Sequence, residues 1–250
     1  MKVILNPSNL AQTVKHIRGS AKLIDKQKIS QFVYEFTFEM LDPLEINFKA
    51  GQYIAVVISP AVRRQYSISS APQSKKQFQM IVDIKPNGIG VNYLMNLKSA
   101  DVIQFIGQIG LFVLPEILKK NLYFISTGTG IAPLKSMIED LINRNQSKSH
   151  NIKVIFGTRY IDDIFYTENF NKYLKEILID DYKIYLSRPD KTYPQIEEGY
   201  VTKYFENMKE NDLEKAQFYI CGGNEMIKSL EQQLLSKGVN AGNIIYEKFY

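Results

Sequence analysis

The sequence is poor in residues that bind metals or form disulfides. Its 250 residues include one cysteine, Cys221, and two histidines, His16 and His150. One cysteine cannot form a disulfide within the chain, and these three side chains do not make a zinc site or hold an iron–sulfur cluster. We therefore expect no metal centre.

Long apolar runs and a strong charge bias are also missing. The start, Met1 to Pro7, lacks the hydrophobic region of a secretory signal, and no run approaches the roughly 20 apolar residues that span a bilayer. The net charge is +5, but lysine and arginine are scattered among acidic residues. We expect a cytoplasmic protein with no membrane span and no nucleic-acid partner.

What the sequence does contain is enough apolar material for two globular domains. Hydrophobic residues make up 45% of the chain and charged residues 23%, so burial can offset the entropy of ordering. The pattern of apolar residues changes near residues 115–121. We predict one domain of residues 1–117 and a second of residues 118–250.

The two halves predict different folds. Between residues 21 and 114, short β-rich runs such as 32–38, 52–58 and 78–84 are separated by turn residues, which predicts an antiparallel barrel or sandwich. After residue 115, strands alternate with helices, which predicts βαβ units on a parallel sheet. The helix signals include Pro133 in a first turn, Asn224 as an N-cap and Gly238 just past a helix end. The predicted strands are 122–126, 152–156, 182–186, 217–221 and 244–249.

Three segments offer groups that bind nucleotides, and each also has a plain structural explanation. Gly128-Thr129-Gly130 joins a strand to a helix, where backbone N–H groups and the helix dipole attract an anion, but glycines also serve tight turns without a ligand. Residues 64–70 combine a cation, an aromatic ring and hydroxyls that suit a flavin nucleotide, or they form an edge strand. Residues 88–94 are a second phosphate cradle or a simple turn.

The order of these segments resembles the ferredoxin–NADP reductase family of flavoproteins, from about residue 21 onward. Each motif is modest, whereas the ordered set is specific. The resemblance implies an N-terminal antiparallel Greek-key barrel that binds FAD, followed by a Rossmann-like α/β domain that binds NADP or NAD. The motifs are Gly51-Gln52-Tyr53, Arg64-Gln65-Tyr66-Ser67, Gly88 to Leu94, Gly128 to Pro133, Phe156-Gly157-Thr158-Arg159, Cys221-Gly222-Gly223 and Glu247-Lys248-Phe249-Tyr250.

For FAD, the resemblance implies a site on two neighbouring segments of the first domain. Arg64 would hold the pyrophosphate, Tyr66 would pack on the flavin, and Ser67 would lie near N5, the atom that accepts hydride. Val91 stands where a hydroxyl is usual, which weakens one contact but leaves the backbone cradle. The implied FAD-binding residues are Arg64, Gln65, Tyr66, Ser67, Gly90, Val91 and Asn92.

For the dinucleotide, the resemblance implies phosphate binding at Gly128 to Gly130 and a nicotinamide ring facing Cys221. Composition alone favours Cys221 as a small buried residue that ends a core strand. Arg188 occupies the place that binds a 2′-phosphate, yet Pro189 follows it as in NAD-using relatives, so NADPH is only slightly favoured. The implied residues are Gly128, Thr129, Gly130, Thr158, Arg159, Ser187, Arg188, Cys221 and Gly222.

The C-terminus matches the aromatic cover of the flavin in plant-type members. Phe249 occupies that position and Tyr250 adds a second ring, while the plain alternative is that Phe249 packs the last strand. Glu247 either handles protons at the flavin or is a surface carboxylate. The candidate catalytic residues are Ser67, Cys221, Glu247 and Phe249.

The predicted activity is hydride transfer between NAD(P)H and FAD, with electrons passed to a separate carrier such as ferredoxin or flavodoxin. A separate carrier is expected because the chain has no cysteine cluster. Two alternatives stay open. One is the reductase component of an oxygenase or a free-flavin reductase, and the other is a flavin subunit that depends on a partner and has no nicotinamide activity of its own.

Overall fold

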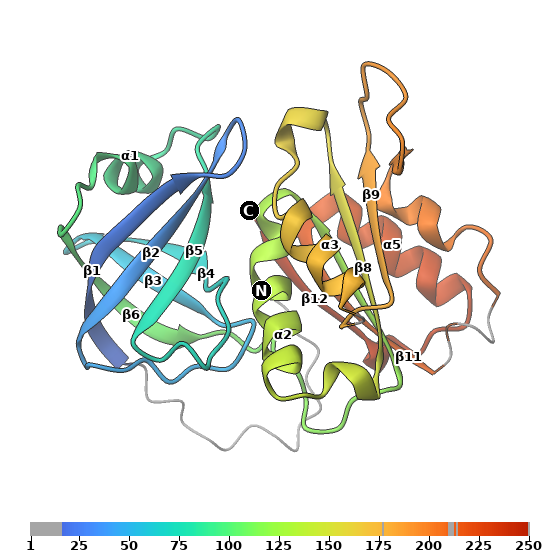
Figure 1. The fold of residues 1–250 in the computed structure, drawn as a ribbon, viewed down its shortest axis with the longest axis horizontal. Helices are drawn as coiled ribbons and strands as arrows, with labels where there is room; N and C mark the ends of the chain where they lie inside the picture. Colours follow the sequence, from blue (N-terminus) through green and yellow to red (C-terminus); the bar gives the residue numbers. More distant parts are fainter. Residues whose placement is uncertain (1–16, 177, 210–212, 214, 250) are drawn as a thin grey trace.

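Two six-stranded sheets organise the residues that the structure describes. The structure is a computed structural model that describes residues 17–176, 178–209, 213 and 215–249. The two sheets lie side by side, and helix α2 (Ile131–Asn143) stands at their junction (Figure 1). The first sheet contains β1 (Ile17–Lys28), β2 (Val33–Asp42), β3 (Tyr53–Ser59), β4 (Val62–Ser67), β5 (Gln77–Asp83) and β6 (Val102–Ile109).

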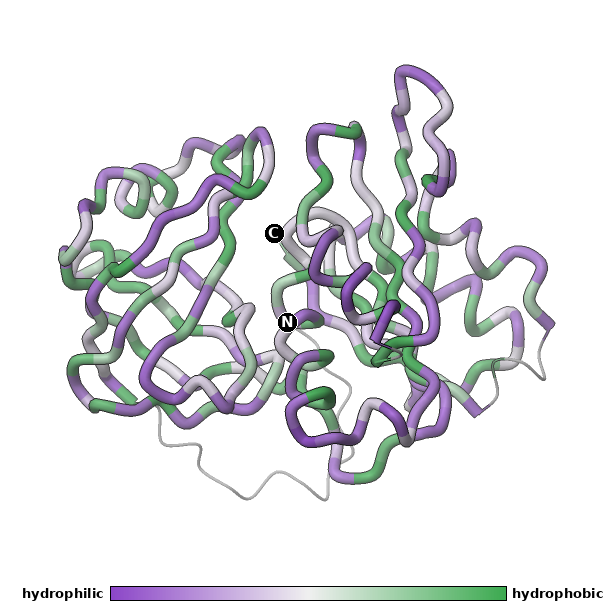
Figure 2. Tube along the Cα trace, in the orientation of Figure 1, coloured by the Kyte–Doolittle hydropathy of each residue, from purple (hydrophilic) through white to green (hydrophobic). Residues whose placement is uncertain are grey.

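The first sheet is antiparallel and curls into a barrel, as predicted. Its strand order is β4-β3-β6-β1-β2-β5, and a bridge between Ile68 and Met80 brings the two edges together. The barrel strands contain both apolar and polar stretches (Figure 2). Phe38 stacks on Phe78 with ring centroids 5.4 Å apart, inside the barrel. Phe36 and Phe38 are two residues apart on β2 and are both fully buried, because alternate side chains of a strand share one face.

The second sheet is parallel, which confirms the predicted α/β domain. Its order is β10-β9-β8-β7-β11-β12. The order reverses between β7 and β11, and such a switch point is where open α/β sheets bind ligands. The strands are β7 (Asn121–Thr127), β8 (Asn151–Thr158), β9 (Asp181–Leu186), β10 (Ile196–Glu198), β11 (Ala216–Gly223) and β12 (Ile244–Phe249).

Among the described residues, the other α-helices alternate with strands in the second domain, as predicted, and one more lies in the barrel domain, where the sequence suggested a turn. They are α1 (Ile89–Asn96), α3 (Thr167–Lys175) and α5 (Asn224–Ser236). Gly238 follows the end of α5 with φ +80°, which suits a glycine. The predicted N-cap Asn224 is wrong by one position, because β11 runs through Gly223 and the helix begins directly after it, so Gly223 is the N-cap.

One apolar core crosses the junction between the two bodies. The first turns of α2 are buried on both sides, by the parallel sheet and by barrel residues that include Ala50, Ile81 and Phe112.

The predicted boundary at residues 117/118 falls between β6 and β7. Among the described residues, no helix has both the length and the hydropathy that a membrane crossing requires.

Candidate functional site

A cleft of about 850 Å³ opens between the barrel and the C-terminal strand β12. Its barrel wall comes from β4 and from the start of α1, and its opposite wall includes Thr129, Ala132 and Phe249. The predicted FAD-binding residues that line it are Arg64, Gln65, Tyr66, Ser67, Gly90 and Val91.

Strand β4 is an edge strand, and it also forms a wall of the cleft. It pairs with β3 on one side only, and its side chains alternate between two directions. Arg64 and Tyr66 point toward Gly90, whereas Ser67 belongs to the other set and is buried. Gln65 donates from Nε2 to the Tyr53 hydroxyl at 3.3 Å.

Gly90 leaves room for the side chains of β4 at the start of α1. A Cβ there would lie 2.5 Å from the Tyr66 hydroxyl and 2.7 Å from Arg64 Cγ. The N–H of Asn92 already donates to Gly88 O at 2.9 Å, so the N–H groups left outside the helical ladder belong to residues 89–91. A cation beside a helix N-terminus fits the pyrophosphate of FAD.

Two tyrosines on the barrel wall are held neutral. Burial raises the pKa of Tyr66 to about 12 despite the nearby Arg64 guanidinium, so its ring offers an uncharged stacking face. Burial, with a smaller contribution from the charge of Glu247, raises the pKa of Tyr53. No role was predicted for Tyr53 from the sequence, although it ends the Gly51-Gln52-Tyr53 motif that carried part of the resemblance.

Glu247 is an acid in a desolvated position, which excludes the plain surface carboxylate. It lines the cleft, and burial raises its pKa to about 7. Its Oε2 is buried and accepts no hydrogen bond from any described residue. A buried oxygen without a partner is costly unless a ligand or a proton satisfies it. Its position therefore fits a cofactor site.

Phe249 makes contacts of two kinds. Its side chain lines the cleft and also packs against the core that crosses the junction. The register of β12 places it opposite Gly223 of β11. Tyr250, the alternative cover, lies outside the described residues.

The turn after β7 and the end of β11 meet at the switch point of the parallel sheet. Residues 128–130 form a short 3₁₀ helix that leads into α2, and Gly128 has φ +54°. A Cβ on Gly130 would collide with the carbonyl of Cys221, and one on Gly222 would collide with the Thr127 hydroxyl. Glycine is therefore required at both places, because it lets the turn after β7 pack closely against the end of β11.

Cys221 does not reach the cleft wall. The residue is fully buried, and burial raises the pKa of its thiol well above the ordinary value, with a further contribution from the charge of Glu247. The thiol is therefore protonated at neutral pH and is a poor nucleophile. The buried position agrees with what composition alone favoured, a small residue that ends a core strand.

The structure joins two arginines that are far apart in the sequence. Ser187 N donates to Thr158 O and Arg188 N donates to Arg159 O, both at 3.0 Å. Arg159 and Arg188 are thus neighbours at the carboxyl ends of β8 and β9, and both are exposed. Residues 199–201, the next segment of the motif order, contain no cation, whereas the preceding strand end contributes Arg159. These four residues lie outside the lining of the cleft.

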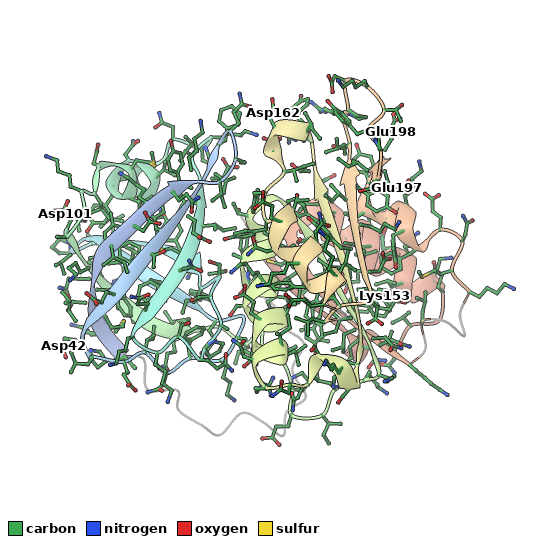
Figure 3. The ribbon with its side chains drawn as sticks, viewed as in Figure 1. Asp42, Asp101, Lys153, Asp162, Glu197 and Glu198 are labelled. Carbon is green, nitrogen blue, oxygen red and sulfur yellow. The ribbon has the colours of Figure 1, made fainter. Side chains whose placement is uncertain are left out.

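Acidic residues flank this edge. Glu197 and Glu198 belong to β10, which pairs with β9 (Figure 3).

Among the residues that the structure describes, no group of three or more His, Cys, Asp or Glu side chains is placed to hold a metal ion.

Known proteins match both halves of the chain. The oxidoreductase FAD-binding domain family matches residues 20–114, and the oxidoreductase NAD-binding domain family matches residues 124–232. The toluate 1,2-dioxygenase electron transfer component of Pseudomonas putida is 28% identical over 231 residues, which are 92% of this chain and 67% of that protein. Ferredoxin–NADP reductase B of Sorangium cellulosum is 32% identical over 171 residues, 67% of this chain and 69% of that protein.

A solved structure shows the same fold. The ferredoxin NADP⁺ reductase of Neisseria gonorrhoeae, with bound FAD and NADP, has a TM-score of 0.78 and 20% identity, over 93% of this chain and 99% of that one. The domain order, the relatives and the ordered motifs agree. The chain belongs to the ferredoxin–NADP reductase family and is an FAD-dependent oxidoreductase that takes electrons from NAD(P)H.

Proposed function

We propose that the chain uses NADPH and passes electrons to a small carrier protein such as a ferredoxin or a flavodoxin. The observation that carries the nucleotide choice is the pair of adjacent residues Arg159 and Arg188. Two guanidinium groups on neighbouring strand ends suit the 2′-phosphate that NADP carries and NAD lacks. Glu198, which pairs with Leu186 on the next strand, opposes this attraction, so the preference needs a direct test.

On the barrel side, the residues of β4 and α1 hold and orient FAD. Arg64 pairs with the pyrophosphate, which also receives N–H groups of Gly90 and Val91. Tyr66 supplies one face for the flavin ring, and Ser67 places its hydroxyl near N5. Bound FAD supplies the redox chemistry, because it accepts a hydride and releases electrons to a carrier.

On the other side, the switch point receives the dinucleotide. Gly128, Thr129 and Gly130 present backbone N–H groups to its phosphates, and Gly222 lets Thr127, which precedes this turn, pack closely against β11. Thr158 and Ser187 lie along its ribose. Cys221, as a buried neutral thiol, forms part of the layer beneath the nicotinamide.

Phe249 and Glu247 control what reaches the flavin. The Phe249 ring covers the face of the flavin, excludes water from it, and moves aside when nicotinamide binds. Glu247, with its pKa of about 7, holds a proton on its carboxyl for part of the time at neutral pH and exchanges it beside Tyr53.

The electron acceptor lies outside these 250 residues, which include a single cysteine and so hold no cysteine-ligated cluster. The relative named ferredoxin–NADP reductase B supports a ferredoxin or flavodoxin carrier. The dioxygenase component, which matches more of this chain, supports a second candidate, the reductase of an oxygenase. A cytoplasmic location stays a prediction.

The deciding experiment is an anaerobic titration of the purified protein with NADPH and, separately, NADH, followed by the visible band of the flavin. We expect bleaching at lower NADPH than NADH concentrations, and then transfer to added ferredoxin or flavodoxin, measured by reduction of cytochrome c. Equal responses to both nucleotides would remove the 2′-phosphate assignment. A flavin that neither nucleotide bleaches would favour the partner-dependent subunit.

A further inference from the structure

Helix α2 carries a lysine where its neighbours are apolar. Lys135 lies just over one turn after Gly130 and is 4% exposed, between the parallel sheet and the barrel. Burying an ammonium group is costly unless the group is paired, and a well-packed apolar residue in such a place is often at least as stable. Packing alone therefore does not explain this residue.

Lys135 and Ser136 donate to two consecutive carbonyls of the barrel. Lys135 Nζ lies 3.4 Å from Ser69 O, and the Ser136 hydroxyl donates to Ser70 O at 2.7 Å. We call these two bonds the Ser69–Ser70 tether. Two adjacent donors on a rigid helix fix the direction of a strand end as well as its distance.

The tether ends immediately beside the flavin wall. Ser69 is two residues after Ser67, and Ile68 between them donates its N–H to Gln52 O at 3.0 Å. The other end of the tether is the helix that begins at the dinucleotide turn. The backbone from Ser67 to Ser70 and the two hydrogen bonds of the tether therefore connect the FAD wall to the helix that follows the dinucleotide turn.

Residues of both bodies support the charge of Lys135. Glu139 accepts from Lys135 Nζ at 2.8 Å and from the Tyr173 hydroxyl at 2.8 Å. The ammonium group also lies 5.1 Å from the centroid of the Tyr166 ring, and the Tyr166 hydroxyl donates to Glu35 of the barrel. The cluster thus spans α2, α3 and β2.

We propose that Lys135 is a positioning residue for hydride transfer, acting with Ser136 through the Ser69–Ser70 tether. Hydride moves between two separately bound groups, so its rate depends on the distance and angle between the two sites. A misplacement of about 1 Å can cost roughly 100-fold in rate. The role applies to reduction of FAD by either nucleotide and does not depend on the identity of the carrier.

The test uses a charge-balanced variant, K135M/E139Q, which removes the ion pair without leaving one charge buried alone. The matched control is K172M/E176Q, an exposed pair with the same i,i+4 spacing on α3 and 3.9 Å between its charged atoms. We expect K135M/E139Q to keep its FAD and its nucleotide affinity within about twofold, while flavin reduction at saturating nucleotide slows roughly tenfold or more. The control keeps the wild-type rate, and K135R recovers most of it.

A second measurement does not depend on activity. Hydrogen–deuterium exchange of the segment 67–71 should accelerate in K135M/E139Q and in S136A, and stay unchanged in the control. Unchanged exchange would show that the tether does not hold this segment. Faster exchange with an unchanged reduction rate, or loss of FAD from a folded variant, would overturn the positioning role. If the double variant does not fold, S136A alone decides between these outcomes.

Discussion

The barrel wall of the cleft and the strand ends that face the dinucleotide differ in how completely they are assembled. On the barrel side, Ser67 is buried and Tyr66 is half-buried, and the stem of the exposed Arg64 packs with Tyr66 beside Gly90. On the other side, Arg159 and Arg188 extend from strand ends and are exposed. A preassembled wall suits a cofactor that stays bound, whereas an open edge suits a cosubstrate that leaves in every turnover. From this comparison we expect the protein to retain FAD more firmly than the dinucleotide.

The largest effect should come from filling the two glycine positions, one on each side. A Cβ on Gly90 collides with Tyr66 and Arg64, and one on Gly130 collides with backbone of Cys221. Gly130→Ala should lower kcat/KM for the dinucleotide by roughly 100-fold, because the Cys221 carbonyl is backbone and cannot move without loss. Gly90→Ala should weaken FAD binding by roughly 100-fold, because the new Cβ displaces the side chains of Arg64 and Tyr66 that we propose hold FAD. FAD dissociation and steady-state kinetics measure the two effects.

The matched control is Gly88→Ala. Gly88 precedes α1 and has φ −83°, and a Cβ added to it would meet no atom within 4 Å. We expect FAD binding and kinetics to stay within about twofold of wild type. The comparison breaks if Gly90→Ala and Gly130→Ala each weaken both ligands equally.

Next in size is the discrimination between nucleotides on the open edge. Arg188→Ala should raise the KM for NADPH by roughly 10- to 100-fold, the usual loss of a hydrogen bond to a charged group, and leave that for NADH nearly unchanged. Arg159→Ala should act in the same direction, since the two residues are adjacent. Parallel changes for NADPH and NADH would place both arginines away from the 2′-phosphate.

Glu247 sharpens the comparison because it comes from the second domain yet faces the barrel wall. Its pKa in the folded protein is raised from 4.5 to about 7, so the folded state loses stability as pH rises through this range. Glu247→Gln should remove that loss and stabilise the FAD-free protein by about 2 kcal/mol more at pH 8 than at pH 5. Urea unfolding of the wild type and of Glu247→Gln at pH 5 and pH 8 measures this difference in stability. The same difference at both pH values would contradict the raised pKa of Glu247.

The smallest effect is expected at Ser67. Ser67→Ala removes the hydroxyl that we propose lies next to N5, so flavin reduction should slow about fivefold, the value of one neutral hydrogen bond, with FAD retained. Stopped-flow absorbance measures the rate. Unchanged kinetics would assign Ser67 to packing alone.

The sequence predicted the fold and the barrel side of the site better than the dinucleotide side. Barrel residues such as Arg64, Tyr66 and Ser67 are adjacent on one strand, so a local motif contains their geometry. The pairing of Arg159 with Arg188 depends on the register of two parallel strands, which no local pattern states. Periodicity identifies the face of a strand but not its neighbour.

Burial separated other residues that looked alike in the sequence. Cys221 and Glu247 both follow apolar runs near the ends of strands, yet one thiol is sealed in the core and one carboxylate lines the cleft. Sequence alone also does not reveal the burial of Lys135. A lysine on a helix usually faces solvent, but here the barrel covers it. Contacts between domains decide these cases.

The core that crosses the junction restricts how this protein can be divided or recombined. Phe112 and Ala50 of the barrel pack with Met137 of α2, so a separately expressed barrel would expose that apolar surface to water. A chimaera that takes its barrel from a relative should also need the residues of α2 that pack against that barrel. Sequence drift in the two domains is therefore coupled at this face, even where the ligands they bind are different.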